Sequence, residues 1–171
     1  SITLIKNKEN LGFAAAVNIG IKASKSDFVA LLNNDTEVDE KWLVNLYSVI
    51  SKDDKIFSAS SKMIRFYERD KIDDAGDQYN LLGWAYKRGD GVSIDQFNKD
   101  KIIFSTCAGA GLYRRKIFEE IGYFDENFFA YLEDVDVSFR GNIYGYKNIY
   151  VNNDWDIELI ENLGVDAIRK G

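Results

Sequence analysis

An apolar run that ends in three polar side chains constrains the fold more than any other stretch of this chain. Residues 28–32, FVALL, are five apolar side chains in succession, and Asn33, Asn34 and Asp35 follow them. Such a run without alternation is typical of a strand that is covered on both faces in a parallel sheet. We therefore expect a buried strand of an α/β sheet with polar groups at its carboxyl end, where such sheets bind ligands.

The segments around this strand also indicate an α/β fold. Residues 2–7, ITLIKN, predict a short strand, and Phe13, Val17 and Ile21 lie four apart on one face of a predicted helix. Strand, helix and strand in this order form a crossover unit. In the next segment Trp42 or Leu43, then Leu46 and Ile50, have helical spacing, and a strand is predicted over residues 55–66.

The second half of the chain alternates in the same way. Residues 67–100 contain four glycines among Asp, Tyr and Asn, which predicts an irregular excursion or hairpins. A strand is expected within residues 101–115, then a helix, an aromatic turn, a helix from residue 133 and a strand at 147–151. A chain of 171 residues has room for one ordinary domain, so we expect one α/β domain with a mixed sheet.

Charge and composition exclude several classes of function. The chain has 28 acidic and 22 basic residues, a net charge of −6, which argues against nucleic acid as a partner. No apolar run approaches the 18 residues of a membrane span. The single cysteine, Cys107, forms no internal disulfide, and together these features predict a cytoplasmic protein.

The chain contains no histidine. This excludes catalytic Ser-His-Asp and Cys-His groups and any His-ligated zinc site within the chain. A metal would have to bind oxygen ligands, which favours hard ions such as Mg²⁺ or Mn²⁺.

Three clusters are candidates for chemistry. Asp35 at the predicted strand end suits a divalent ion that also contacts a diphosphate, although Asn and Asp are equally typical of a turn. Glu133, Asp134 and Asp136 crowd a predicted helix start, where the helix dipole alone would favour them, but a carboxylate beside an aromatic wall is also a suitable general base. Gly109 and Gly111 inside an apolar run indicate close approach of a ligand or another segment.

Four ordered blocks of the sequence resemble the family 2 glycosyltransferases of the GT-A fold, in particular the rhamnosyltransferase-like branch. The blocks are NLGFAAAVNIGI, FVALLNNDTEVDEKWL, CAGAGLYRRKIFEEIGYFDENFFAYLEDVDVSFR and GYKNIYV. The resemblance implies a GT-A type nucleotide-sugar-binding sandwich with a mostly parallel mixed sheet over residues 1–151.

The resemblance also assigns roles to particular residues. Asp35 would bind the metal in a DxD-like motif, with Asn33 and Asn34 beside the donor. Asp134 would be the catalytic base, and Glu133 would orient the acceptor or the base. The remaining residues that it places around the donor are Asn10, Asn18, Gly109, Ala110 and Gly111.

The implied activity is that of an inverting, metal-dependent hexosyltransferase with Mg²⁺ or Mn²⁺ as cofactor. It would move a sugar from a nucleotide-sugar donor to a hydroxyl of a glycan or lipid-linked acceptor in surface polysaccharide or glycan synthesis. Peripheral association with the inner membrane face is compatible with this activity.

The chain departs from the family pattern at both ends. Relatives usually begin with a strand-helix unit of the type VSVVIVTYN, which is missing here, so the fold is expected to be incomplete at the N-terminus, and a homo-oligomer or a partner chain would complete it. Relatives also tend to have a histidine after the GYK strand. Residues 152–171 instead predict an amphipathic helical extension of unknown role, with Ile157, Ile160 and Leu163 on one face.

Three alternatives follow from the same residues. The first is a non-catalytic relative that keeps weak nucleotide-sugar binding or a scaffold role. The second is a nucleotidylyltransferase, although residues 6–16 are a poor triphosphate-binding loop. The third is a structural interaction domain.

Overall fold

The computed structural model describes residues 2–152 and 157–159. Its centre is a five-stranded sheet with strand order β1-β9-β3-β10-β8. The bounds of these strands are Phe28–Leu32 (β1), Ala110–Arg114 (β9), Ile56–Ser61 (β3), Lys147–Val151 (β10) and Lys101–Ile103 (β8). The predicted mixed α/β sheet is therefore confirmed.

The balance of strand directions in this sheet differs from the prediction. Strand β9 is antiparallel to both β1 and β3, β8 is antiparallel to β10, and β3 and β10 form the one parallel pair. The sheet is thus mostly antiparallel, and the expectation of a mostly parallel sheet was wrong. The chain enters β9 beside the carboxyl end of β1, where the Asn33 N–H donates to the Gly109 carbonyl at 2.8 Å. Because β9 begins where β1 ends, the two strands run in opposite directions.

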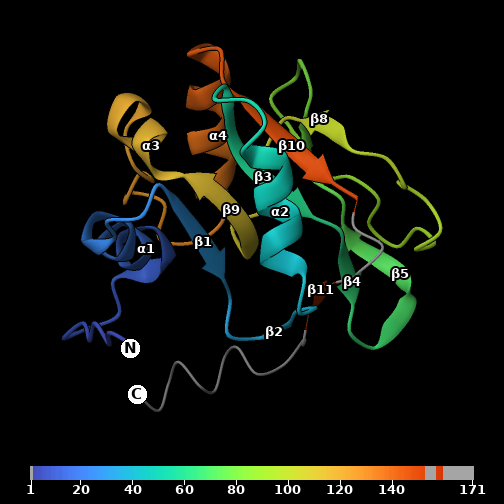
Figure 1. The fold of residues 1–171 in the computed structure, drawn as a ribbon, viewed down its shortest axis with the longest axis horizontal. Helices are drawn as coiled ribbons and strands as arrows, with labels where there is room; N and C mark the ends of the chain where they lie inside the picture. The colour runs from blue at the N-terminus through green and yellow to red at the C-terminus, as the bar shows by residue number, and fades with distance from the viewer. Residues whose placement is uncertain (1, 153–156, 160–171) are drawn as a thin grey trace.

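In the part of the chain that the structure describes, four helices cover the two faces of this sheet. Their bounds are Gly12–Ala23 (α1), Trp42–Ile50 (α2), Arg115–Ile121 (α3) and Glu133–Ile143 (α4). Helix α2 crosses in front of the sheet in Figure 1 and buries Trp42, Leu46 and Ile50, the predicted stripe. The other face packs against residues of α1, α3 and α4, around Phe57 and Tyr113.

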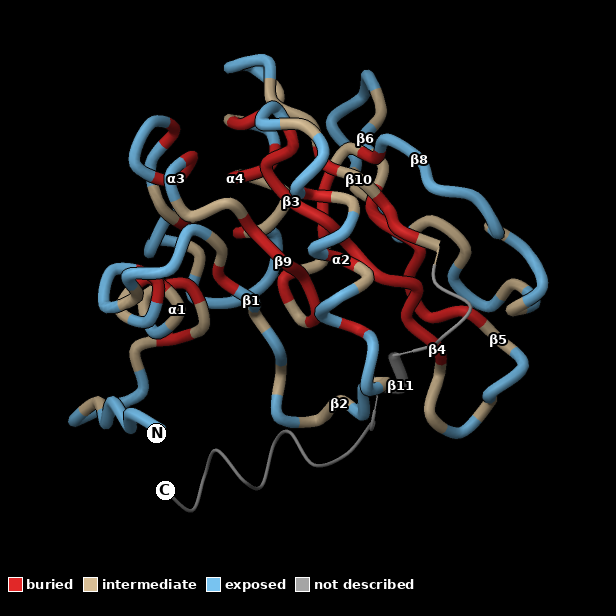
Figure 2. The backbone as a smooth tube through the Cα atoms, viewed as in Figure 1, coloured by how far each residue is buried: buried red, intermediate tan, exposed pale blue. Residues whose placement is uncertain are grey.

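Strand β1 lies at an edge of the sheet, not in its interior. Only Val29 of this strand is buried, whereas all six residues of β3 are buried, and Figure 2 shows the same contrast between β1 and the central strands. The prediction that residues 28–32 are covered on both faces was therefore wrong. Residues 2–7 are not a strand either, because within the described part of the chain no neighbouring strand pairs their backbone.

A second sheet and a hairpin are attached to the central sheet. The four-stranded sheet has the order β2-β11-β4-β5, and the hairpin pairs β6 with β7. Their bounds are Thr36–Glu37 (β2), Ile157–Leu159 (β11), Met63–Arg65 (β4), Glu68–Asp74 (β5), Asp77–Tyr79 (β6) and Ala85–Lys87 (β7). A hairpin was among the structures predicted for residues 67–100, and β6 and β7 form one there.

The expected C-terminal helix is wrong where the structure describes it. Ile157–Leu159 form strand β11, which pairs with β2 on one side and with β4 on the other. Hydrogen bonding to two neighbours satisfies this backbone as a helix would. The other residues of the predicted 152–171 extension, apart from residue 152, lie outside the described part of the chain. Among the described residues no helix has the length and apolar character needed to cross a membrane.

Helix α4 is present as predicted, but it buries a different face. Val135, Phe139 and Ile143 recur at intervals of four and share one face of this helix, yet Phe139 and Ile143 are exposed. The buried face contains Glu133, Val137, Ser138 and Gly141 instead. Gly141 allows this close packing, because a Cβ there would lie 3.2 Å from the ring of Phe57. The first turn of α4 therefore directs carboxylates inward.

Candidate active site

The predicted polar strand end is held against the loop that precedes β9. The Asn33 N–H donates to the carbonyl of Gly109 at 2.8 Å. A Cβ on Gly109 would lie 3.3 Å from Asn33 Nδ2, so glycine permits this close approach. The hydroxyl of Thr36 donates to the Asn33 carbonyl at 2.7 Å and closes a tight turn. This turn fixes the position of the two residues between Asn33 and Thr36.

Asp35 lies within that turn and is half-buried, whereas Asn34 is exposed. The Oδ1 atom of Asp35 is buried and has no hydrogen-bond partner among the described residues. A buried carboxylate oxygen without a partner is costly, so such an atom calls for a ligand. The turn thus presents one free oxygen ligand at the carboxyl end of β1.

The second predicted cluster begins at a strained turn. Tyr131 and Leu132 have φ angles of 74° and 68°, in the left-handed region that non-glycine residues rarely adopt. They come directly before Glu133, the first residue of α4. Backbone strain of this kind is common at functional sites. Here it sets the direction in which helix α4 starts.

Asp134 is fixed by hydrogen bonds to its carboxylate and its carbonyl. Oδ2 accepts the N–H of Ala108 at 3.1 Å, and Oδ1 accepts the N–H of Val135 at 2.8 Å. The hydroxyl of Ser105 donates to the Asp134 carbonyl at 3.1 Å. The first turn of α4 is therefore attached to residues 105–108, the loop between β8 and β9.

These contacts bring the two predicted clusters to the same loop. Ala108 donates to Asp134, and the next residue, Gly109, accepts from Asn33. Asn33 and Asp134 are separated by about a hundred residues of sequence, but both form hydrogen bonds to the dipeptide Ala108-Gly109. The end of β1 and the start of α4 therefore line the same region of the molecule.

Glu133 is more deeply buried than Asp134. Its Oε2 atom has no hydrogen-bond partner in the described part of the chain. Burial raises the pKa of Glu133, and the nearby charge of Asp134 acts in the same direction. A carboxyl group in such surroundings favours its neutral form.

The pKa of Asp134 is also raised, chiefly because burial penalises its carboxylate. The N–H groups of Ala108 and Val135 and the charge of Lys87 oppose that effect. A carboxylate with a raised pKa is a stronger proton acceptor than an exposed one. The position and environment of Asp134 thus suit a general base.

Two further carboxyl groups of this region were missed from the sequence. Burial is the main cause that raises the pKa of Asp74 to about 7 and that of Asp77 to about 8. The charge of Asp134 contributes to both shifts. Both residues lie in the stretch that the sequence indicates only as an irregular excursion. The signal was the series Asp73, Asp74 and Asp77, but these residue types are equally typical of turns.

The other predicted donor-binding residues have structural contacts. Ala110 and Gly111 are buried in β9, and a Cβ on Gly111 would lie 2.7 Å from Thr106. The Asn10 side chain accepts the N–H of Gly12 at 2.9 Å at the start of α1. Gly111 therefore permits close packing of the loop, and Asn10 stabilises the turn that precedes helix α1.

Asn18 is buried and faces the turn at residues 124–126. Its side chain accepts the N–H of Phe124 at 3.1 Å and donates to the Phe124 carbonyl at 2.8 Å. It also donates to Glu126 at 3.0 Å. These bonds use the acceptor and both donors of the amide. In this structure Asn18 fastens helix α1 to the segment between α3 and α4.

A divalent ion would find one protein carboxylate at this site. Within the described residues no group of three or more Cys, Asp or Glu side chains is placed to hold a metal. The unpartnered Oδ1 of Asp35 is nevertheless a hard oxygen ligand of the type that Mg²⁺ and Mn²⁺ accept. Mg²⁺ commonly binds through one or two carboxylates together with water and substrate phosphates. The residues therefore fit an ion that arrives with a phosphorylated substrate.

The fold resembles that of a protein whose structure has been solved. The crystal structure of GalNAc-T7 with UDP, GalNAc and Mn²⁺ superimposes with a TM-score of 0.72 at 18% sequence identity, covering 91% of this chain and 31% of that chain. Residues 1–122 match the model of the family described as glycosyl transferase family 2. This chain belongs to that family. The predicted family and GT-A fold of the glycosyltransferase are thereby confirmed.

Two curated relatives are also glycosyltransferases. The low-salt glycan biosynthesis hexosyltransferase Agl10 of Haloferax volcanii is 23% identical to this glycosyltransferase over 172 residues, 98% of this chain and 54% of the relative. An uncharacterized glycosyltransferase of Haemophilus influenzae is 27% identical over 89 residues, 52% of this chain and 25% of the relative. The chain thus spans about half the length of the first relative and a quarter of the second.

Proposed function

We propose that this glycosyltransferase moves a hexosyl group from a nucleotide-sugar donor to a hydroxyl group of a glycan or lipid-linked acceptor, with inversion at the anomeric carbon. The observation that carries the proposal is the attachment of Asn33 and Asp134 to neighbouring residues, Gly109 and Ala108, at 2.8 and 3.1 Å. This arrangement supports a diphosphate bound at the end of β1 and an acceptor beside α4.

In the proposed reaction Asp134 accepts the proton of the acceptor hydroxyl. The acceptor oxygen forms a bond to the anomeric carbon as the bond from that carbon to the diphosphate breaks on the opposite side. The hydrogen bonds from Ala108 and Val135 hold the carboxylate in place, so little reorganisation is needed when the proton moves. Glu133, buried beside Asp134, would orient the base or the acceptor.

Asp35 would hold a Mg²⁺ or Mn²⁺ ion through its free Oδ1 atom. Such an ion offsets negative charge that develops on a departing diphosphate. Asn33 and Asn34 would lie beside the donor, and Gly109 would hold Asn33 in place through the hydrogen bond between their backbones. The proposed setting is a cytoplasmic one, in the synthesis of a surface polysaccharide or another glycan.

The test is a transfer assay with nucleotide-sugar donors, in which release of nucleoside diphosphate is followed for the wild type, Asp134→Asn and Asp35→Ala. Both variants are expected to lose most transfer. Undiminished turnover in either variant would contradict the role proposed for that residue. Binding of a nucleotide sugar without any release of nucleoside diphosphate would favour a non-catalytic relative instead.

A further inference from the structure

The turn of the β6–β7 hairpin presents apolar side chains at the surface. Residues 79–84 read YNLLGW. Leu81 is fully exposed, and Leu82 and Trp84 are 83% and 72% exposed. Figure 2 shows this turn largely in pale blue above the β6 label. Single apolar side chains are ordinary on a protein surface, but a cluster of them in one turn is typical of a binding surface.

Leu81 and Leu82 form one wall of an apolar groove between the hairpin turn and helix α4. The groove has a volume of about 750 Å³, within the usual range of ligand pockets. Its lining residues are Tyr79, Asn80, Leu81, Leu82, Gly83, Phe104 and Phe139. The rings of Tyr79 and Phe104 stack with their centroids 4.8 Å apart, and the ring of Phe139 lies 5.9 Å from each of them. The floor of the groove is therefore aromatic.

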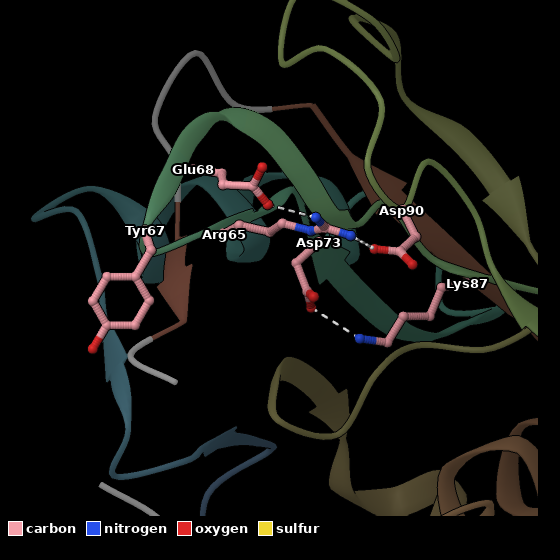
Figure 3. Close-up of a pocket in the computed structure, with 6 residues that line it drawn as sticks. All are labelled: Arg65, Tyr67, Glu68, Asp73, Lys87 and Asp90. Atoms are coloured by element: carbon pink, nitrogen blue, oxygen red, sulfur yellow. Dashed lines mark hydrogen bonds and ion pairs between the residues drawn. The ribbon is translucent and has the colours of Figure 1, made fainter. Parts of the chain in front are cut away.

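A hollow of about 300 Å³ beside strand β5 has the opposite character. Figure 3 shows its charged side chains paired with one another. Arg65 lies 2.7 Å from Glu68 and 2.9 Å from Asp90, and Lys87 lies 3.0 Å from Asp73. Because these charges already have partners, this hollow carries no comparable signal for a ligand, and the apolar groove does.

Polar groups beside the two leucines are hydrogen-bonded within the hairpin turn. Oδ1 of Asn80 accepts the N–H of Leu82 at 2.9 Å and the N–H of Trp84 at 3.2 Å. The Asn80 N–H donates to the Trp84 carbonyl, and the Gly83 N–H donates to the Asn80 carbonyl, both at 3.0 Å. A sugar ring needs partners for its hydroxyl groups, whereas a hydrocarbon chain needs only apolar surface. The groove therefore suits an apolar chain.

Helix α4 extends the apolar surface beyond the groove. Phe139 and Ile143 lie four residues apart, so their side chains are neighbours on one face of the helix, and both are exposed. The opposite face, with Val137 and Gly141, is buried in the core. Folding of the described chain thus leaves the apolar stripe of α4 uncovered, and a chain bound in the groove would cover it.

The groove adjoins the candidate base through a shared helix and a shared loop. Phe139 follows Asp134 by five residues of α4, about 7.5 Å along the helix axis. The side chain of Asn142 donates to the Phe104 carbonyl at 3.0 Å. The hydroxyl of the next residue, Ser105, donates to the Asp134 carbonyl at 3.1 Å. An acceptor with its hydroxyl group at Asp134 would therefore lie within reach of the groove.

We propose that this groove binds the apolar chain of a lipid-linked acceptor whose hydroxyl end lies at Asp134. The inference rests on the proposed function and narrows its acceptor to the lipid-linked class. A bilayer surface or a second copy of the chain would cover the exposed leucines, but neither accounts for a hollow beside the candidate base. The apolar chain of the acceptor accounts for both.

The test measures binding of hexyl, heptyl and octyl glucoside by titration calorimetry, below the concentrations at which they form micelles. Each added methylene should tighten binding about fourfold, the factor expected for burying one CH₂ group. Leu82→Asp and Leu81→Asp place a charge in the groove and should abolish this dependence on chain length. Both positions are exposed, so the fold should be retained. Leu43→Asp, the same change at an exposed position of α2, is the matched control and should bind as the wild type does.

Binding that is independent of chain length in the wild type, or unchanged in both groove variants, overturns the inference and leaves the proposed function standing. Binding that depends on chain length in a protein without any transfer activity contradicts the proposed function, while the groove stands as a site for an apolar chain. Sedimentation with phosphatidylcholine vesicles, or self-association, that is lost in Leu82→Asp without any dependence on glucoside chain length would assign the surface to a bilayer or to a second copy. Either result overturns the inference.

Discussion

The carboxylate of Asp134 accepts a hydrogen bond from the backbone N–H of Ala108, at 3.1 Å. This contact ties the first turn of α4 to the loop that also receives the end of β1 through Gly109. The carboxylate is therefore positioned by backbone rather than by a flexible side chain. Because the same loop holds Asn33, a shift of this loop would move both halves of the candidate site.

Replacing Asp134 by Asn should lower transfer about 10²- to 10⁴-fold, the usual cost of removing a positioned base. Asn keeps the size of the side chain and an oxygen that can accept from Ala108, so the fold should be retained. Asp54→Asn is the control, since Asp54 is almost fully exposed in its pairing with Arg114. Initial rates of nucleoside diphosphate release measure both variants, and an equal loss in both would remove Asp134 from the mechanism.

Asp35→Ala should abolish metal-dependent nucleotide binding without destabilising the unliganded protein. Its Oδ1 has no hydrogen-bond partner to lose among the described residues. Thermal unfolding with Mn²⁺ and UDP is the measurement, because a ligand at about 100 times its Kd stabilises a protein by about 2.7 kcal/mol. The unfolding temperature of the wild type, and of Glu40→Ala as a control at an exposed position, should rise when Mn²⁺ and UDP are added. An equal rise of the unfolding temperature in Asp35→Ala would show that the metal binds at another position.

Asn18→Ala should lower the free energy of unfolding by about 2–4 kcal/mol, because it leaves the N–H and carbonyl of Phe124 without their partner inside the core. Chemical denaturation measures the loss, and Asn45→Ala on helix α2 is the matched control. A loss below about 1 kcal/mol would mean that water replaces the amide. Nucleotide affinity of the folded variant tests the donor-binding role predicted for Asn18 from the sequence.

Stability should fall as the pH rises from about 4 to 8. The unfolded chain releases the protons of Asp74 and Asp77 near pH 4, whereas the folded protein keeps them until about pH 7 and 8. The folded state therefore binds more protons within this window, and raising the pH removes that advantage. Each group contributes on the order of 1 kcal/mol or more, since one pKa unit corresponds to about 1.36 kcal/mol.

Thermal unfolding measured between pH 5 and 8.5 tests whether stability falls as the pH rises. Asp74→Asn should weaken the dependence, because the amide is neutral throughout and its oxygen can still accept the N–H of Gly76. Asp54→Asn, at an exposed carboxylate, should leave the dependence unchanged. A wild-type midpoint that rises toward pH 8 would show that Asp74 and Asp77 are ionised in the folded protein.

The sequence indicates local structure of this glycosyltransferase better than it indicates the neighbours of each element. Trp42, Leu46 and Ile50 face the core as their spacing predicts, because α2 packs on the sheet through its most apolar face. In α4 the apolar spacing of Val135, Phe139 and Ile143 is misleading. Close approach at Gly141 decides which face is buried, and a single sequence does not reveal that approach.

The edge position of β1 and the burial of Asp74 and Asp77 could not be predicted from the sequence for a related reason. The run at β1 is apolar enough for a central strand, yet its place at the sheet edge depends on which other strands are available to pair with it. In the sequence Asp74 and Asp77 are typical of turn residues. In the structure they lie at the β5–β6 connection, where the charge of Asp134 acts on them. Asp35 and Asp134 were singled out as candidates from their places at a predicted strand end and helix start, and the resemblance to the family assigned their expected roles.

The most direct test of the account is a crystal structure of the protein with Mn²⁺ and UDP, in which anomalous scattering locates the metal. We predict a Mn²⁺ peak at the carboxylate of Asp35, bridged to the diphosphate, with the carboxylate of Asp134 facing the space where the sugar would lie. A metal and diphosphate bound away from Asp35, or an Asp134 carboxylate turned from that space, would contradict the single site proposed for the ends of β1 and α4.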